Sequence, residues 1–311
     1  MSVVVLSVFE KEGMEIVSKY LIVTADDFGI SEVTNEAIEE LAEKGRITST
    51  SFILPGKAIE DAVERSSRMS HIDFGLHITL LSDSEIEKWK SYTSRKMLGP
   101  LVDQAGYFHD RMETFLEHAN SAWVMTEIAA QFCYGESLGL KFDHMNSQSG
   151  ILYDLSGKSF LPIAIHFCAG HRLPFRFPKE LIGLEYMLGD AVNDQIKKAH
   201  NVGAEFATIK KVPLPDLVLT NPFSVKEIPS YNHLKQFYLS LLKKLPEGVT
   251  ELFLHPSKET DGYFGQTPEW QKRVWDYQFL LDDDFANLLV EEKIQLVTWK
   301  EAFKIEKVSP E

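Results

Sequence analysis

Residues 20–29 read Tyr-Leu-Ile-Val-Thr-Ala-Asp-Asp-Phe-Gly, an apolar run that ends in two adjacent carboxylates. Its first half, Tyr20 to Thr24, predicts a buried strand. Apolar residues from Val33 to Leu41 then recur on one helix face, and Gly45 suits the position after a helix. A second strand is predicted from Thr48 to Leu54. This order of strand, helix and strand favours parallel strands joined by a crossover helix.

The alternation of strands and helices continues along most of the chain. A stretch from Leu81 to Asp110 interrupts it, because Gly99-Pro100 and Gly106 break regular structure there and indicate a long loop. The pattern is also hard to interpret between residues 177 and 229. The other predicted helices are 57–67, 111–138, 161–169, 231–245 and 269–291, and the other predicted strands are 73–80, 140–145, 174–177, 249–254 and 294–297.

Six or seven parallel strands in one chain suit an α/β fold, a distorted or incomplete (β/α) barrel. The 311 residues contain no internal repeat and no linker rich in Gly, Ser or Pro, so we predict a single domain. It is expected to run from residue 20 to 311, with residues 1–19 as an N-terminal extension.

The composition limits the partners and the compartment of the protein. Hydrophobic residues make up 44% and charged residues 25%, as in globular proteins. The formal charge of −14 disfavours nucleic acid and anionic membranes. Cys133 and Cys168 are far apart and lie in apolar contexts, so a disulfide is not expected. No basic signal region or run of about 18 apolar residues is found, and we predict a cytoplasmic protein.

Asp26 and Asp27 are the sharpest local feature of the sequence, since they stand where a buried strand ends. A turn or a helix N-cap would need only one aspartate. Two neighbouring carboxylates in an apolar setting repel each other unless a cation or a shared proton relieves them. Active sites of parallel α/β folds are built at this end of the strands, which favours a functional interpretation.

Three further clusters lie within or at the ends of other predicted strands, and each is weak by itself. They are His77, the pair Asp143-His144, and His255 before Pro256. In a closed or nearly closed parallel sheet these strand ends converge on one pocket. Asp27, His77 and His144 are then three ligands for one divalent metal ion, while Asp26 and His255 are left as a base and an acid.

These residues resemble the motifs of the YdjC-like carbohydrate deacetylases, which remove acetyl groups from N-acetylated sugars. The similarity extends from Tyr20 to about His255. It implies a distorted (β/α) barrel and a metal-dependent hydrolase, with Asp27, His77 and His144 as metal ligands, Asp26 as base, His255 as acid and Arg176 near the site. The similar motifs are 25–31 with Asn35, 47–51, 74–80, 99–108, 252–256 and Leu173-Pro-Phe-Arg176.

One departure from the family concerns the second ligand histidine. The family usually has an aspartate two residues before it, where this chain has Phe142, and Asp143 is adjacent to His144. A shift of one residue turns a strand side chain to the opposite face. If Asp143 keeps the family register, Met145 takes the ligand position. Further family histidines are replaced by Asn146, Ser147 and Ser149. We expect His144 to be the ligand.

The resemblance implies hydrolysis of an N-acetyl group on a small carbohydrate by a water bound to Zn²⁺ or Mg²⁺. Tyr263 and Phe264, in a loop with flanking glycines, are candidates for stacking on sugar rings. Two alternatives stay open. One carboxylate and two histidines also describe a non-haem iron oxygenase, for which we expect an all-β scaffold. A non-catalytic sugar-binding protein on the same fold is the other, and a homodimer is also open.

Overall fold

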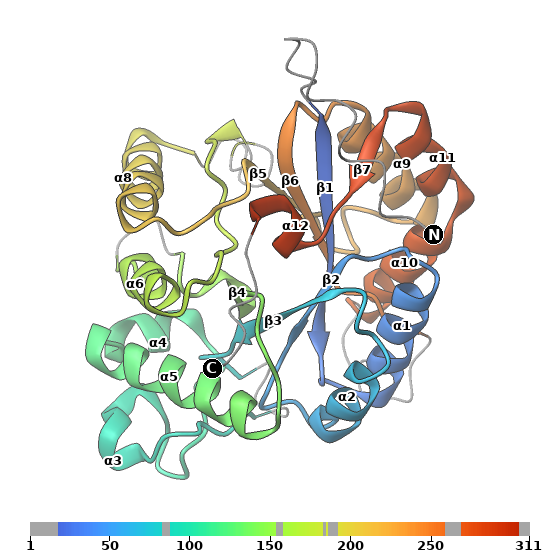
Figure 1. Cartoon of the computed structure of the whole chain (residues 1–311). Helices are drawn as coiled ribbons and strands as arrows, with labels where there is room; N and C mark the ends of the chain where they lie inside the picture. The colour runs from blue at the N-terminus through green and yellow to red at the C-terminus, as the bar shows by residue number, and fades with distance from the viewer. Residues whose placement is uncertain are drawn as a thin grey trace.

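The computed structural model describes residues 18–82, 88–153, 158–182, 185, 192–258 and 269–304. Most of the expected extension 1–19, together with Tyr263 and Phe264, lies outside these ranges. Seven parallel strands form one sheet in the order β4-β3-β2-β1-β6-β5, and β7 pairs with the start of β1 (Figure 1). The strands are β1 (Lys19–Phe28), β2 (Ser49–Phe52), β3 (Asp73–Ile78), β4 (His144–Ser147), β5 (Leu217–Leu219), β6 (Gly248–Leu254) and β7 (Ile294–Leu296).

The barrel is incomplete, as the sequence predicts, because β4 and β5 are the two ends of the strand order. The segment 173–177 passes between them. Arg176 N–H donates to the Met145 carbonyl at 3.0 Å, and Phe175 N–H donates to the Pro213 carbonyl at 3.0 Å. The sequence predicts a strand at 174–177, but these residues form only a single bridge between Met145 and Phe175. The segment therefore links the edges and carries Arg176 into the interior.

Helices cover the outside of the sheet in two groups (Figure 1). One group, on the left of the view, contains α3 to α6 and α8, and the other contains α1, α2 and α9 to α11. No helix in the described ranges is long and apolar enough to cross a membrane. The helices are α1 (Glu32–Glu43), α2 (Ile59–Ser66), α3 (Arg95–Leu98), α4 (Met112–His118), α5 (Ser121–Ser137), α6 (Leu161–His171), α8 (Asp194–Lys210), α9 (Tyr231–Lys243), α10 (Trp270–Leu281), α11 (Asp283–Glu291) and α12 (Trp299–Phe303), with short 3₁₀ turns at Gly99–Leu101 and Gln148–Gly150.

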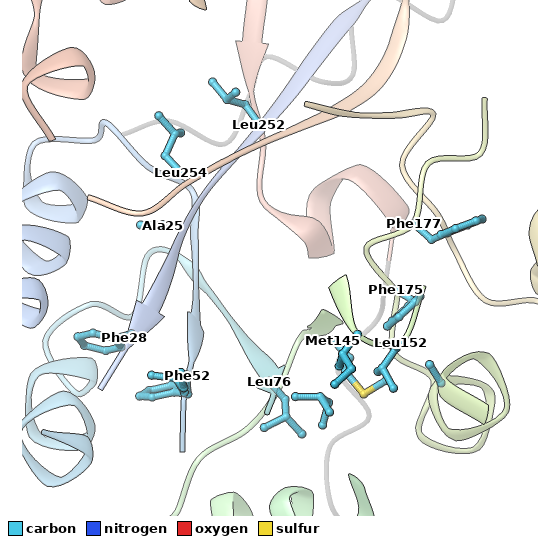
Figure 2. Close-up of a cluster of buried hydrophobic side chains, with 14 of the residues drawn as sticks. Ala25, Phe28, Phe52, Leu76, Met145, Leu152, Phe175, Phe177, Leu252 and Leu254 are labelled. Atoms are coloured by element: carbon cyan, nitrogen blue, oxygen red, sulfur yellow. The ribbon is translucent and has the colours of Figure 1, made fainter. Parts of the chain in front are cut away.

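Buried apolar side chains join the strands to these helices. Ala25, Phe52, Leu76 and Met145 belong to this hydrophobic cluster (Figure 2). Successive side chains of a strand point to opposite faces. The residues that follow them, such as Asp26, His77 and Asn146, therefore point into the barrel, where they contact one another. The alternation thus separates an apolar outer layer from a polar interior.

The structure corrects several predicted element boundaries. The helix expected over 111–138 is two helices, because Asn120 caps α5 by accepting from the Trp123 N–H at 3.0 Å. The strand expected over 140–145 begins only at His144. Helix α8 and strand β5 lie in the segment whose sequence is hard to interpret. The register of β4 matters most, since its pairing with β3 decides which side chain meets His77.

Candidate active site

A cavity of about 510 Å³ opens at the carboxyl ends of the strands. Its lining comes from β1, β3, β4, β5 and β6, from the residues after β4, and from the linking segment 173–177. Asp26, His77, Arg176 and His255, four of the residues predicted from the sequence, line this cavity. The polar groups of distant parts of the chain therefore meet here.

Asp26 is fully buried and already engaged by several donors. Arg176 forms a bidentate ion pair with Asp26, with Nη1 at 2.5 Å from Oδ2 and Nη2 at 2.9 Å from Oδ1. The Ser51 hydroxyl donates to Oδ1 at 2.8 Å and the Asn146 amide at 3.2 Å. Burial alone would raise the pKa of Asp26, but the Arg176 guanidinium outweighs it and holds this pKa well below its usual range. Such a carboxylate is a weak proton acceptor.

Arg176 is shared between Asp26 and a second buried carboxylate, Glu251 of β6. Its Nε donates to Glu251 Oε2 at 2.9 Å and its Nη2 to Oε1 at 2.7 Å. The Thr24 hydroxyl also donates to Oε1, and the guanidinium lies 4.3 Å from the centre of the Phe253 ring. Arg176 is thereby held rigidly between two carboxylates. The predicted place of Arg176 near the site agrees with this geometry.

Asp27 reaches the same region because β1 is irregular at this point. Its φ of 70° is left-handed, and the pairing of β1 with β2 shifts between Ala25 and Phe28. Such a bulge redirects a side chain that a regular strand would turn to the opposite face. Asp27 Oδ2 accepts from Arg273 Nη2 at 2.6 Å, and Oδ1 lies 3.4 Å from His77 Nε2. Burial would raise the pKa of Asp27, but the charges of Arg273, His255 and His77 together outweigh it and lower this pKa.

His255 follows the end of β6 and is partly open to solvent, with 35% of its side chain exposed. Its Nε2 lies 3.9 Å from Asp26 Oδ2, and its backbone N–H donates to Asp276 at 3.2 Å. Burial lowers the pKa of His255 to about 4, although the Asp27 charge opposes that shift. The imidazole is therefore neutral at pH 7 and able to accept a proton.

His144 makes no hydrogen bond to Asp27 or His77. Its ring stacks on Trp299 of α12, with centres 4.6 Å apart, and packs so tightly on Gly75 that a Cβ there would be 2.2 Å from Nε2. Neither ring nitrogen has a hydrogen-bond partner within the described part of the chain. Burial lowers the pKa of His144 well below its usual value. Because β4 pairs His144 with Gly75, the residue paired with His77 is Asn146.

The three-ligand metal site is therefore not assembled as predicted. Asp27 and His77 lie together, but His144 does not join them, and the described residues contain no group of three His, Cys, Asp or Glu side chains able to hold a metal ion. Catalytic zinc sites use three protein ligands. The residues present do not fit such a centre.

Several residues of the site are not predicted from the sequence to act there. Glu251 has a detectable signal, since a carboxylate interrupts the apolar strand 249–254. Asn146 stands out in the sequence only as a replacement for a family histidine. Arg273 has no local signal, because only tertiary packing brings α10 to Asp27. Asp143, whose position raises the question of register, instead pairs with Lys300 at 3.0 Å.

Comparisons with known proteins agree with this architecture. A family model described as YdjC-like protein matches residues 20–291. A carbohydrate deacetylase of Thermoanaerobacter pseudethanolicus is 25% identical over 90% of this chain and 98% of its own length. A chitooligosaccharide deacetylase of Proteus mirabilis is 29% identical over 52% of this chain and 60% of its own length. A crystal structure from Enterococcus faecalis, of a protein named for a proposed cleavage of cellobiose phosphate, superposes with a TM-score of 0.72 at 23% identity, covering 91% of this chain and 98% of that one.

Proposed function

Since the chain belongs to the YdjC-like family, we propose that it is a hydrolase that removes the acetyl group from an N-acetylated sugar. The names of its relatives support the reaction, and the cavity at the strand ends supports the location. The α/β barrel differs from the all-β scaffold that the oxygenase alternative requires. The observation that carries the proposal is a neutral, partly exposed histidine, His255, beside a rigid group of buried charges.

The roles of Asp26 and His255 follow from their surroundings. His255 takes a proton from water while the water oxygen bonds to the acetyl carbon. The carbon–nitrogen bond then breaks, and the same imidazole returns the proton to the leaving amine, so that acetate and a free amino sugar are formed. The Asp26 carboxylate accepts hydrogen bonds from Arg176, Ser51 and Asn146. Its role is to hold these three side chains in place. This assignment replaces our expectation that Asp26 is the base and gives His255 both proton transfers.

A metal requirement is a separate part of the hypothesis. One Zn²⁺ or Mg²⁺ ion stays a prediction for this chain, and the described side chains nearest to such a site are Asp27 and His77. No step of the proton transfer above depends on that ion. A small carbohydrate as the partner, the exclusion of nucleic acid, and a cytoplasmic location likewise stay predictions from the composition and the family.

Acetate release from N-acetylglucosamine oligomers tests the reaction. The wild-type protein is compared with His255→Gln, which keeps a polar side chain of similar size, in the presence and absence of a chelator. We expect about a 10²-fold or larger loss of kcat in His255→Gln, with sugar binding retained. Full activity of His255→Gln would exclude this residue as the base.

The same assay tests the second candidate function, a non-catalytic sugar-binding protein. The incomplete set of metal ligands favours that candidate. Sugar binding without acetate release, even after addition of Zn²⁺ or Mg²⁺, would establish it and refute the hydrolase.

A further inference from the structure

The segment that follows β6 is attached to helix α10 through its backbone. The pairing of β1 with β6 ends before His255, so the next N–H groups need other acceptors. His255 N–H donates to Asp276 Oδ2 at 3.2 Å. Ser257 N–H donates to the Arg273 carbonyl at 3.1 Å. Because Pro256 has no N–H, both donors of this segment bind the same helix.

The same part of α10 holds two other walls of the site. Arg273 Nη2 donates to Asp27 Oδ2 at 2.6 Å, at the end of β1. Lys272 Nζ donates to the carbonyls of Asn221 and Phe223 at 2.7 and 2.9 Å. These two carbonyls lie on either side of a proline that lines the cavity after β5. A short stretch of one helix thereby fixes the segments after β1, β5 and β6 relative to one another.

Asp276 is the side chain of this helix that contacts His255. It is buried, and each carboxylate oxygen has its own donor, since Oδ1 accepts from the Tyr238 hydroxyl of α9 at 3.0 Å. A buried carboxylate costs free energy unless such donors satisfy it. Burial raises the pKa of Asp276 to about 6, against the Lys272 charge and the two hydrogen bonds. At pH 7 the group is therefore mainly ionised, and it accepts the His255 N–H as a carboxylate.

We propose that Asp276 is a positioning residue, which holds His255 in the place that proton transfer requires. The bound N–H restricts the backbone of His255 on one side, and the Pro256 ring restricts it on the other. The imidazole then projects from a fixed Cα, with Nε2 at 3.9 Å from Asp26 Oδ2. Acid–base catalysis depends on such placement. The inference rests on the function proposed above for the role of His255, but the contact itself can be tested without turnover.

Turnover of the N-acetylglucosamine dimer is compared in matched variants of the full-length protein. Tyr238→Phe breaks only the bond to Asp276 Oδ1 and is the control. The double variant Tyr238→Phe/Asp276→Ala also removes the acceptor of the His255 N–H, and it leaves no tyrosine hydroxyl without a partner. We expect kcat of the double variant to be at least about tenfold below that of Tyr238→Phe, with KM changed by less than about twofold.

The conservative change Asp276→Asn gives a second variant, in case the double variant does not fold. Its side-chain oxygen still accepts the His255 N–H, and its amide group can donate to the Tyr238 oxygen. Asp276→Asn should therefore keep kcat within about threefold of the wild type. A loss of tenfold or more in this variant would overturn positioning by a hydrogen bond.

Labelling with ¹⁵N-histidine tests the contact directly. The chain has ten histidines, and the backbone amide signal of His255 is the one that is lost in His255→Gln. Its proton should resonate downfield in the wild type and in Tyr238→Phe, because a carboxylate accepts it. In the double variant the signal should move upfield.

Two outcomes of the comparison overturn the proposal. One is equal kcat in Tyr238→Phe and the double variant, and the other is an unchanged His255 amide signal. If the wild type releases no acetate but the amide signal moves as expected, the hydrolase is refuted and the placement of His255 by Asp276 stands.

Discussion

The side-chain oxygen of Asn146 lies 2.7 Å from Nδ1 of His77, and this contact decides which nitrogen of His77 carries a proton. The amide nitrogen of Asn146 donates to Asp26 at 3.2 Å. A carboxylate only accepts, so the amide nitrogen must face Asp26 and the oxygen must face His77. His77 Nδ1 is therefore the donor. Its Nε2 then faces Asp27 Oδ1 at 3.4 Å.

Replacing Asn146 by Ala should release His77 from this single tautomer. The wild-type ring is expected to show a protonated Nδ1 in ¹⁵N–¹H correlation spectra, with the signal assigned by its loss in His77→Gln. In Asn146→Ala the ring should exchange between tautomers, because the fixed acceptor is gone. Ser147→Ala, the neighbouring change, is the control and should leave the spectrum unaltered. A wild-type ring protonated only on Nε2 would disprove the assignment.

The pH dependence of activity should report the lowered pKa of His255. If the neutral imidazole accepts the proton from water, the acid limb of kcat/KM should fall at about pH 4 and not near the ordinary value of 6.5. The measurement is a pH profile of acetate release between pH 3.5 and 8. A limb centred near 6.5 would contradict the lowered pKa of His255.

Stability should change with pH for the same reason. The folded protein binds a proton at His255 less readily than the unfolded chain, so this residue makes stability rise with pH between about 4 and 6.5. His255→Gln should lack that contribution. We expect the difference in Tm between wild type and His255→Gln to shift against the wild type as the pH falls through this window. A constant difference would show that the pKa of His255 is normal.

Loss of Arg176 should be among the most damaging single changes. Arg176→Met leaves Asp26 and Glu251 buried without their cation, which costs about 3–5 kcal/mol of unfolding free energy for a broken buried pair. Lys179→Met is the control, since Lys179 is exposed and its surface pair is worth about 0–1 kcal/mol. Denaturant unfolding measures both. Equal effects of the two changes would contradict the buried network.

The position of His144 can be tested through Gly75. A methyl group at residue 75 would overlap the His144 ring, so Gly75→Ala should cost about 1–3 kcal/mol. The same change should cost little in a His144→Ala background, because the ring is gone. Gly170→Ala, which has open space around it, is the control. An equal cost of Gly75→Ala in both backgrounds would place the ring elsewhere.

Metal titration distinguishes the predicted ligand set from the observed one. With two donors, Asp27 and His77, we expect weak binding of Zn²⁺ and loss of that binding in His77→Gln. His144→Ala should bind Zn²⁺ as the wild type does, because His144 is stacked on Trp299. A tenfold or larger loss of affinity in His144→Ala would restore it as a ligand.

The alternation of helices with parallel strands and the polar ends of β1, β3 and β6 were predictable from the sequence. Apolar runs and helical spacing are local properties, and a parallel sheet brings its carboxyl strand ends to one edge. The amino-acid order alone therefore leads to the expectation that Asp26, His77 and His255 share one site, and the resemblance to the YdjC-like family adds Arg176. The prediction of one long helix over 111–138 is wrong, because the break at Asn120 depends on a single capping contact that the helical spacing does not reveal.

The register of β4 and the pairing of buried charges required the tertiary structure. The pairing of β4 with β3 sets Gly75 beside His144 and Asn146 beside His77. No local pattern contains that choice, because it depends on how β4 aligns with β3 and on the packing of Trp299 against the His144 ring. Arg273 and Glu251 likewise act across more than 70 residues of sequence, on Asp27 and on Arg176. The sequence by itself determined which groups gather at the strand ends, and only the folded chain decided which of them are free to react.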